Sequence, residues 1–543
     1  MSEKKKNDYL LQGGILAIAG LITRFIGMIY RIPLTRIVGA EGMTYYNTAY
    51  EIYNMALLVS TYSIPVALSK LVSAKDAKGE YINSNRLFRV GMVISGGLGF
   101  VVSTLLYIFA DELATFMQWS NAAIPLRVLA PTIFVFSIMG IIRGFFQGKK
   151  TMVPTAVSQI IEQIFNAIFS IVAAVLLIRA NQDTALVAAY GAAGGTAGTL
   201  IGAVFGLIFL LIIYHINSEY FTRKCLKDHT GVIDSTPELA RSIILTMLPI
   251  VLSQTIYQLS GIIDNYMFSE IMYSKGMQQA QKAVLYETYS NKYKWLYNLP
   301  VAIASAFGVS IVPTLSATFG SGDMAAVKNK IASSLKLNMV IAIPAAAGLS
   351  VLARPILVLL FNSTNDAISP KLMTLGGTAV IFFALSTFTN GVLQGIGRLK
   401  TPMIHSLIAL IIHIPLVIVL VKYMNLSVYG MVIGNVTYGL TVCVLNWFSI
   451  ADALDYQQEI KTTFLLPALS SVVMGAAALA VYKLLYLLTR SNTVAVIPAI
   501  VVAVLIYFVC LLKFKAVSLE ELRGFPKGQT LVRIAQKLHL LSE

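Results

Sequence analysis

Two arginines in an otherwise apolar stretch near the N-terminus have side chains that could bind an anion. Steps of four, three and four residues separate four residues that share one face of a helix, Gly20, Arg24, Gly27 and Arg31. At 1.5 Å per residue, Arg24 lies about 21 Å into this apolar run, well inside the hydrocarbon of a bilayer. A charge at that depth is costly unless it is solvated or paired. The stripe therefore predicts a water-filled cavity that binds an anionic ligand or, alternatively, a fixed ion pair with Glu51.

Four other apolar runs carry polar side chains at helical spacing, and together the stripes predict a shared hydrophilic interior. The candidate substrate-binding residues are Arg24, Arg31, Asn47, Glu51, Gln163, Asn166, Gln258, Lys292 and Lys294. The candidate carboxylates for coupling to an ion, H+ or Na+, are Glu51, Glu162 and Asp264. Asparagine and glutamine also join helices by hydrogen bonds, and the two lysines could equally extend to the membrane surface. His405 and His413 could hydrogen-bond within the packing or relay protons.

The composition predicts the class of protein that holds these residues. Of the 543 residues 57% are hydrophobic and 12% charged, and the mean hydropathy is +0.75, more than a water-soluble core requires. We therefore expect an all-α polytopic membrane protein. The net charge of +16 comes from cations in short connections between apolar runs, as membrane topology requires, so nucleic acid is not an expected partner.

Several catalytic and metal-binding patterns do not occur in the sequence. Three distant cysteines have no metal-ligand spacing, and no phosphate-binding loop or zinc-protease motif occurs. We therefore predict no metal and no cofactor. The polar loops are too short to hold a catalytic domain, which favours a transporter over an enzyme.

The apolar runs predict fourteen transmembrane helices. They fall near residues 10–38, 44–72, 87–110, 122–147, 153–179, 185–215, 242–272, 284–319, 332–361, 370–396, 402–424, 426–450, 462–489 and 493–514. The expected organisation is an N-lobe of six helices (1–215), a linker (216–240), a C-lobe of six helices (241–450), two further helices (451–514) and an amphipathic tail (515–543). Counting Lys and Arg on either side predicts that both termini are cytoplasmic. The tail is expected to lie on the inner leaflet.

The two predicted lobes carry the signature of a duplication. Gly144, Gln147 and Gly148 return at one constant spacing as Gly391, Gln394 and Gly395. Six helices per copy give both copies the same orientation, so the lobes should be pseudo-symmetric about an axis along the membrane normal, around a central cavity. In the sixth run, glycines recur at steps of four, at Gly194, Gly198, Gly202 and Gly206. This spacing predicts close packing against a neighbouring helix.

Four segments resemble the polysaccharide-transporter branch of the multidrug/oligosaccharidyl-lipid/polysaccharide superfamily, in particular its stage V sporulation protein B-like and MurJ-type members. They are TRFIGMIYRIPLTRIVGAEGMTYYNTAY from Thr23, IPVALSKLVS from Ile64, GFFQGKKTMVPTAVSQIIEQ from Gly144 and PTLSATFGSGD from Pro313. The resemblance implies fourteen helices and two lobes around a cationic cavity. It also implies that Arg24 matches the family's cavity arginine, whereas Tyr30, Tyr45 and Asn166 stand where relatives have charged residues.

The resemblance also implies a function. It is the movement of an undecaprenyl-pyrophosphate-linked sugar, such as lipid II, from the inner to the outer leaflet of a bacterial plasma membrane by alternating access. The partners would be this lipid-linked substrate, membrane lipids and a coupling ion, and we expect a monomer. Two alternatives are a cation/drug antiporter of the same superfamily and a membrane-embedded enzyme of lipid-linked glycan assembly.

Overall fold

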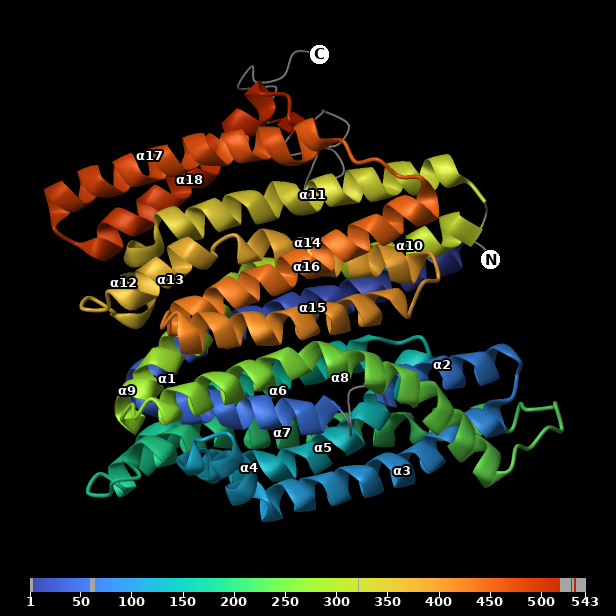
Figure 1. Cartoon of the computed structure of the whole chain (residues 1–543). Coiled ribbons are helices and arrows are strands. Elements are labelled where there is room, and N and C mark those ends of the chain that lie inside the picture. The colour runs from blue at the N-terminus through green and yellow to red at the C-terminus, as the bar shows by residue number, and fades with distance from the viewer. Residues whose placement is uncertain (1–2, 59–63, 321, 518–528, 530–531, 534–543) are drawn as a thin grey trace. The chain divides into compact units, whose positions relative to one another are not determined.

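The computed structural model describes residues 3–58, 64–320, 322–517, 529 and 532–533, and every regular element among them is a helix (Figure 1). Two compact units comprise Met1–Glu287 and Thr288–Glu543. The helices of the first unit are α1 (Glu3–Leu57), α2 (Ile64–Ala77), α3 (Tyr81–Ile108), α4 (Ala110–Phe116), α5 (Ala123–Gly148), α6 (Val153–Ala180), α7 (Val187–Cys225), α8 (Thr236–Ser274) and α9 (Gln279–Glu287).

The second unit begins with the π-helical segment η3 (Thr288–Tyr293). Its α-helices are α10 (Lys294–Gly320), α11 (Met324–Val351), α12 (Ala353–Phe361), α13 (Ile368–Gly376), α14 (Ala379–Gly395), α15 (Thr401–Ile418), α16 (Val428–Leu454), α17 (Leu466–Thr489) and α18 (Asn492–Lys513). The predicted tail, 515–543, lies largely outside the described residues. Of its described members, Val532 is buried in a cluster with Tyr507 and Leu511 of α18.

The helices confirm the predicted all-α membrane fold. Within the described part of the chain, ten helices are long and apolar enough to cross a bilayer, and the number is eleven if the pair α13 and α14, bent by 43°, is one broken span. One of the ten, 18–57, covers parts of two predicted runs. The runs near 242–272 and 284–319 are helical as well, in α8 and in α9, η3 and α10.

Helix α1 folds back on itself at Gly39. This residue has φ 74° and ψ 175°, which a glycine adopts without the steric cost that a side chain would bring. The side chains of Arg31 and Asn47 hydrogen-bond although they are 16 residues apart, a separation of about 24 Å along a straight helix. The two arms of α1 therefore run antiparallel and lie side by side.

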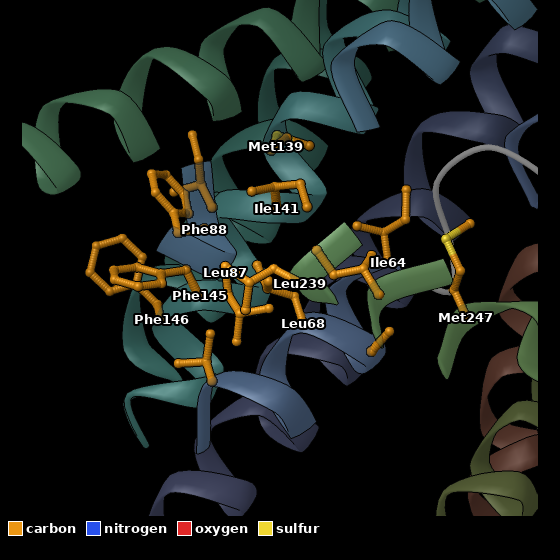
Figure 2. Packing of buried hydrophobic residues seen from close by; sticks show 14 of the residues in the cluster. Ile64, Leu68, Leu87, Phe88, Met139, Ile141, Phe145, Phe146, Leu239 and Met247 are labelled. Carbon is orange, nitrogen blue, oxygen red and sulfur yellow. The ribbon is translucent and has the colours of Figure 1, made fainter. Parts of the chain in front are cut away.

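The core of the first unit joins α8 to the helices that precede it in the chain. Figure 2 shows Leu239 of α8 among Leu68 of α2, Leu87 of α3 and Phe145 of α5, and Met247 of α8 belongs to the same buried cluster. Because this apolar contact holds α8 within the first unit, the boundary between the units falls at Glu287. The predicted boundary at the linker 216–240 and the six-plus-six organisation of the lobes stay predictions.

The glycine face of α7 packs closely on α6, as its spacing predicts. An added Cβ would lie 2.4 Å from the backbone nitrogen of Ser170 if placed at Gly198, and 2.4 Å from the carbonyl oxygen of Glu162 if placed at Gly202. Such distances are shorter than any real contact, so only glycine permits this approach of the two backbones.

We expect Gly198→Ile to reduce the stability of the folded protein by about 1–3 kcal/mol or more, because the added side chain would overlap the backbone of α6. Thermal unfolding in detergent, followed by fluorescence-detected size exclusion, measures this loss. Gly97→Ile is the matched control, since an added Cβ at Gly97 in α3 has no atom within 4 Å. Equal melting temperatures for the two variants would contradict the packing described here.

Candidate functional site

The best-defined polar site in the first unit surrounds Arg31. Its Nη2 donates a hydrogen bond of 2.5 Å to Oδ1 of Asn47, and its guanidinium carbon lies 5.5 Å from the centre of the Tyr46 ring. Arg31 comes from the first arm of α1 and its two partners from the second, so the turn at Gly39 creates the arrangement. Both contacts are to neutral side chains, and both orient the guanidinium group.

Polar side chains of α6 and α7 extend this site. Asn166 Nδ2 donates to the hydroxyl of Tyr30 at 3.5 Å, and that hydroxyl lies 3.5 Å from the hydroxyl of Tyr46. Thr199 of α7 hydrogen-bonds both to Oδ1 of Asn166 and to the hydroxyl of Tyr50. A chain of hydrogen-bonding groups therefore connects α6 and α7 to the aromatic partner of Arg31.

Arg24 and Gln163 lie on the two helices that face each other at Gly27. An added Cβ at Gly27 would lie 3.2 Å from Nε2 of Gln163, so this side chain packs on the first arm of α1. The side chain of Arg24, one turn away on α1, is exposed in the structure. The role of Arg24 and Gln163 in binding a substrate stays a prediction.

Glu51 belongs to a second polar network. Its carboxylate accepts hydrogen bonds from Nδ2 of Asn265 at 2.6 Å and from the hydroxyl of Tyr286 at 3.1 Å. Asn265 Oδ1 accepts from Nε1 of Trp119 at 2.9 Å. Lys282 lies with its ammonium nitrogen 4.1 Å from the centre of the Trp119 ring. The sequence stripes included neither Trp119 nor Tyr286, because buried aromatic residues usually belong to the core. Lys282 was not included because it lies between two predicted apolar runs.

Glu162 lies in a buried ion pair. Arg143 Nη2 is 2.9 Å from Glu162 Oε2, and Arg143 Nε donates to the hydroxyl of Ser158 at 2.9 Å. Both charged side chains are largely buried, with 11% and 19% of their surface exposed. The sequence analysis did not select Arg143, although a lone cation in an apolar run is the same signal that selected Arg24.

The candidate residues of the second unit lie near η3. Lys292 Nζ is 2.8 Å from Oδ2 of Asp366, in the loop before α13. Burial would raise the pKa of Asp366, but hydrogen bonds from Lys292 and Ser369 hold that pKa below its usual value. An anionic substrate would have to compete with this carboxylate for Lys292. Lys294 lies with its ammonium nitrogen 4.9 Å from the centre of the Tyr289 ring.

Two further candidates lie in α8. The side chain of Gln258 lies outside the described part of the structure. Asp264 is 2% exposed, next in the chain to Asn265 of the Glu51 network. Across the residues that the structure describes, no group of three His, Cys, Asp or Glu side chains could hold a metal ion.

Comparisons with known families and proteins agree with the resemblance found in the sequence. Residues 10–319 match the family described as polysaccharide biosynthesis protein, and residues 295–419 match the MatE family. The chain is 27% identical over 487 residues to "Lipid II flippase MurJ" of Bacillus subtilis (strain 168), with 86% of this chain and 87% of that protein covered. It is 24% identical over 534 residues to "Stage V sporulation protein B" of the same organism, with 97% and 100% covered.

A solved structure shows the same fold. "Lipid II flippase MurJ, inward closed conformation" matches with a TM-score of 0.65 and 18% identity, covering 92% of this chain and 98% of that one. Together with the family matches, it confirms the predicted resemblance to the multidrug/oligosaccharidyl-lipid/polysaccharide superfamily. The activity that these names state is transport rather than catalysis, in agreement with the absence of enzyme motifs from the sequence.

We expect Arg143→Ala to destabilise the protein by about 3–5 kcal/mol, because it leaves the carboxylate of Glu162 buried without its cation. The double variant Arg143→Leu, Glu162→Leu should recover most of this loss, since it removes both charges. Melting temperatures in detergent measure both effects, with Arg179→Ala, at an exposed arginine in the last turn of α6, as the control. A double variant as unstable as the single one would show that the ion pair is not the reason.

Proposed function

The chain belongs to the polysaccharide biosynthesis protein family, and from this premise we propose its function. The chain is a membrane flippase of a lipid-linked precursor or a polysaccharide. The substrate that we propose is an undecaprenyl-pyrophosphate-linked sugar, lipid II or a related cell-wall precursor, carried from the inner to the outer leaflet of a bacterial plasma membrane. The protein would act as a monomer with both termini in the cytoplasm.

The observation that carries the proposal is the oriented guanidinium group of Arg31. A pyrophosphate carries about two negative charges and cannot cross hydrocarbon unaided, so its transporter needs cations within the membrane. Arginine suits this ligand because its planar fork of N–H donors matches two phosphate oxygens at once. Asn47 and Tyr46 contact the group and orient it. Arg24, seven residues earlier on the same helix face, would supply a second cation.

The other parts of the substrate fit the remaining side chains. Tyrosine and asparagine side chains, such as those of Tyr50 and Asn166, supply hydrogen-bonding groups of the kind that sugars require. The polyprenyl tail could stay in the lipid throughout. The membrane potential is worth about 2.3 kcal/mol per charge per 100 mV, enough to bias a cationic site, and an H+ or Na+ gradient is the other source of energy.

The match of residues 295–419 to the MatE family favours one other function, a cation/drug antiporter of the same superfamily. A site for hydrophobic cations would require carboxylates in place of the arginines of α1. Efflux of such cations by the purified protein, without movement of lipid-linked sugars, would support this alternative.

We expect Arg31→Ala and Arg24→Ala each to reduce flipping at least about tenfold, because a hydrogen bond to a charged group contributes about 1.5–3 kcal/mol. Arg31→Lys should also be impaired, since lysine keeps the charge but loses the bidentate geometry. Exposure of lipid II on the outer leaflet, in cells depleted of other flippases, is the measurement. Arg490→Ala, at an exposed turn between α17 and α18, is the control. Normal exposure with Arg31→Ala, at matched protein levels, would overturn the assignment.

A further inference from the structure

Another polar network in the membrane helices, separate from those of Arg31 and Glu51, surrounds His405 of α15, in the second unit. His405 Nδ1 lies 2.8 Å from Oδ1 of Asn446, and His405 Nε2 lies 3.3 Å from the hydroxyl of Ser449. Asn446, which is fully buried in α16, donates from Nδ2 to Thr389 Oγ1 at 2.9 Å and to Asn390 Oδ1 at 2.7 Å. Three helices, α14, α15 and α16, therefore meet around one imidazole ring.

The hydrogen bonds determine which ring nitrogen carries the proton. The hydroxyl of Thr389 donates to the carbonyl groups of Leu385 and Ser386, so its oxygen accepts from Asn446. The amide nitrogen of Asn446 therefore faces α14, and its amide oxygen faces His405. Because that oxygen only accepts, His405 Nδ1 must be the donor. In the neutral ring, Nε2 then accepts a hydrogen bond from the hydroxyl of Ser449.

Nε2 can take up a proton without breaking the network. A protonated Nε2 would donate to the oxygen of Ser449, whose hydroxyl hydrogen can turn to a carbonyl of its own helix, as serine does in helix interiors. Histidine is the side chain whose ordinary titration falls between pH 5 and 8. Both protonation states of His405 can therefore satisfy every hydrogen-bonding group around the ring.

Charged groups lie close to the ring, in the turn before α15 and on α16. Arg398, in the turn before α15, donates to the carbonyl oxygen of Ser449 and to Asp452 of α16, each at 3.5 Å. Lys400 is the other cation of this turn. Asp452 is 78% exposed, so water screens its charge more than that of Arg398. An imidazolium at His405 would share Ser449 with a guanidinium, and a change in the packing of α14, α15 and α16 would alter this repulsion.

We infer that His405 is a proton-binding site of this transporter, with Nε2 as the acceptor, and that its protonation changes the transport rate by shifting the packing of α14, α15 and α16. Proton binding and helix packing are coupled in both directions. If the proton binds more tightly in another arrangement of the three helices than in the one described here, then binding the proton favours that other arrangement. Only the effect on transport rests on the proposed flippase function. The proton site itself does not.

The proton site is tested by NMR of the full chain in nanodiscs, with histidine labelled by carbon-13 and nitrogen-15. We expect one ring to carry its proton on Nδ1 at high pH and to gain a second proton on Nε2 as the pH is lowered, and its signals to be absent from His405→Gln. A proton on Nε2 of His405 at high pH, or no second proton at any pH at which the protein stays folded, would overturn the inference.

The effect on rate is tested with the same protein in liposomes, using lipid II and a fixed membrane potential at several pH values. We expect the wild-type rate to change severalfold between pH 5.5 and 8, and His405→Gln to remove most of that change, since a glutamine at this position can donate to Asn446 and accept from Ser449. His229→Gln, at an exposed loop histidine, should keep the wild-type profile. A His405→Gln profile equal to that of the wild type would refute the effect on rate. Absence of flipping by the wild type at every pH would instead refute the proposed function and leave the NMR result intact.

Discussion

The constraint on which this structure depends is that polar groups within apolar helices must find partners there. A buried charge or amide without a partner costs several kcal/mol, so each polar group restricts how its helix can rotate and pack. Arg143 fixes α5 against α6 through Glu162, and Asn446 fixes α16 against α14 and α15. Apolar side chains alone would leave many rotations of these helices nearly equal in energy.

The sequence predicted the helices well because each follows from a local property. A run of about twenty apolar residues has to be helical in a bilayer, since only a helix satisfies its own backbone there. The spacing of glycines in α7 predicted close packing for a similarly local reason. The sequence could not show which helices pack on α8, because this depends on the burial of Leu239 and Met247 among residues far away in the chain.

The partners of the polar residues could be predicted only in part. Spacing placed Arg31 and Asn47 on two separate helix faces, but their hydrogen bond depends on the turn at Gly39, which brings the two arms of α1 together. Trp119, which lies between two predicted runs, and Tyr286, which lies in a run with a polar stripe but outside that stripe, both donate to the Glu51 network, so periodicity selected neither. Tertiary packing determines these partners, so they cannot be derived from the sequence without the fold.

These partners also separate the candidate carboxylates by what protonation would do to them. Protonation of Glu162 would leave the guanidinium of Arg143 buried beside a neutral acid, which repeats the cost of an unpaired charge. Glu51 accepts from Asn265 and Tyr286, both neutral, and a protonated Glu51 could still hydrogen-bond to either side chain. The ion pair of Glu162 therefore suits a permanent contact between α5 and α6 rather than a coupling role.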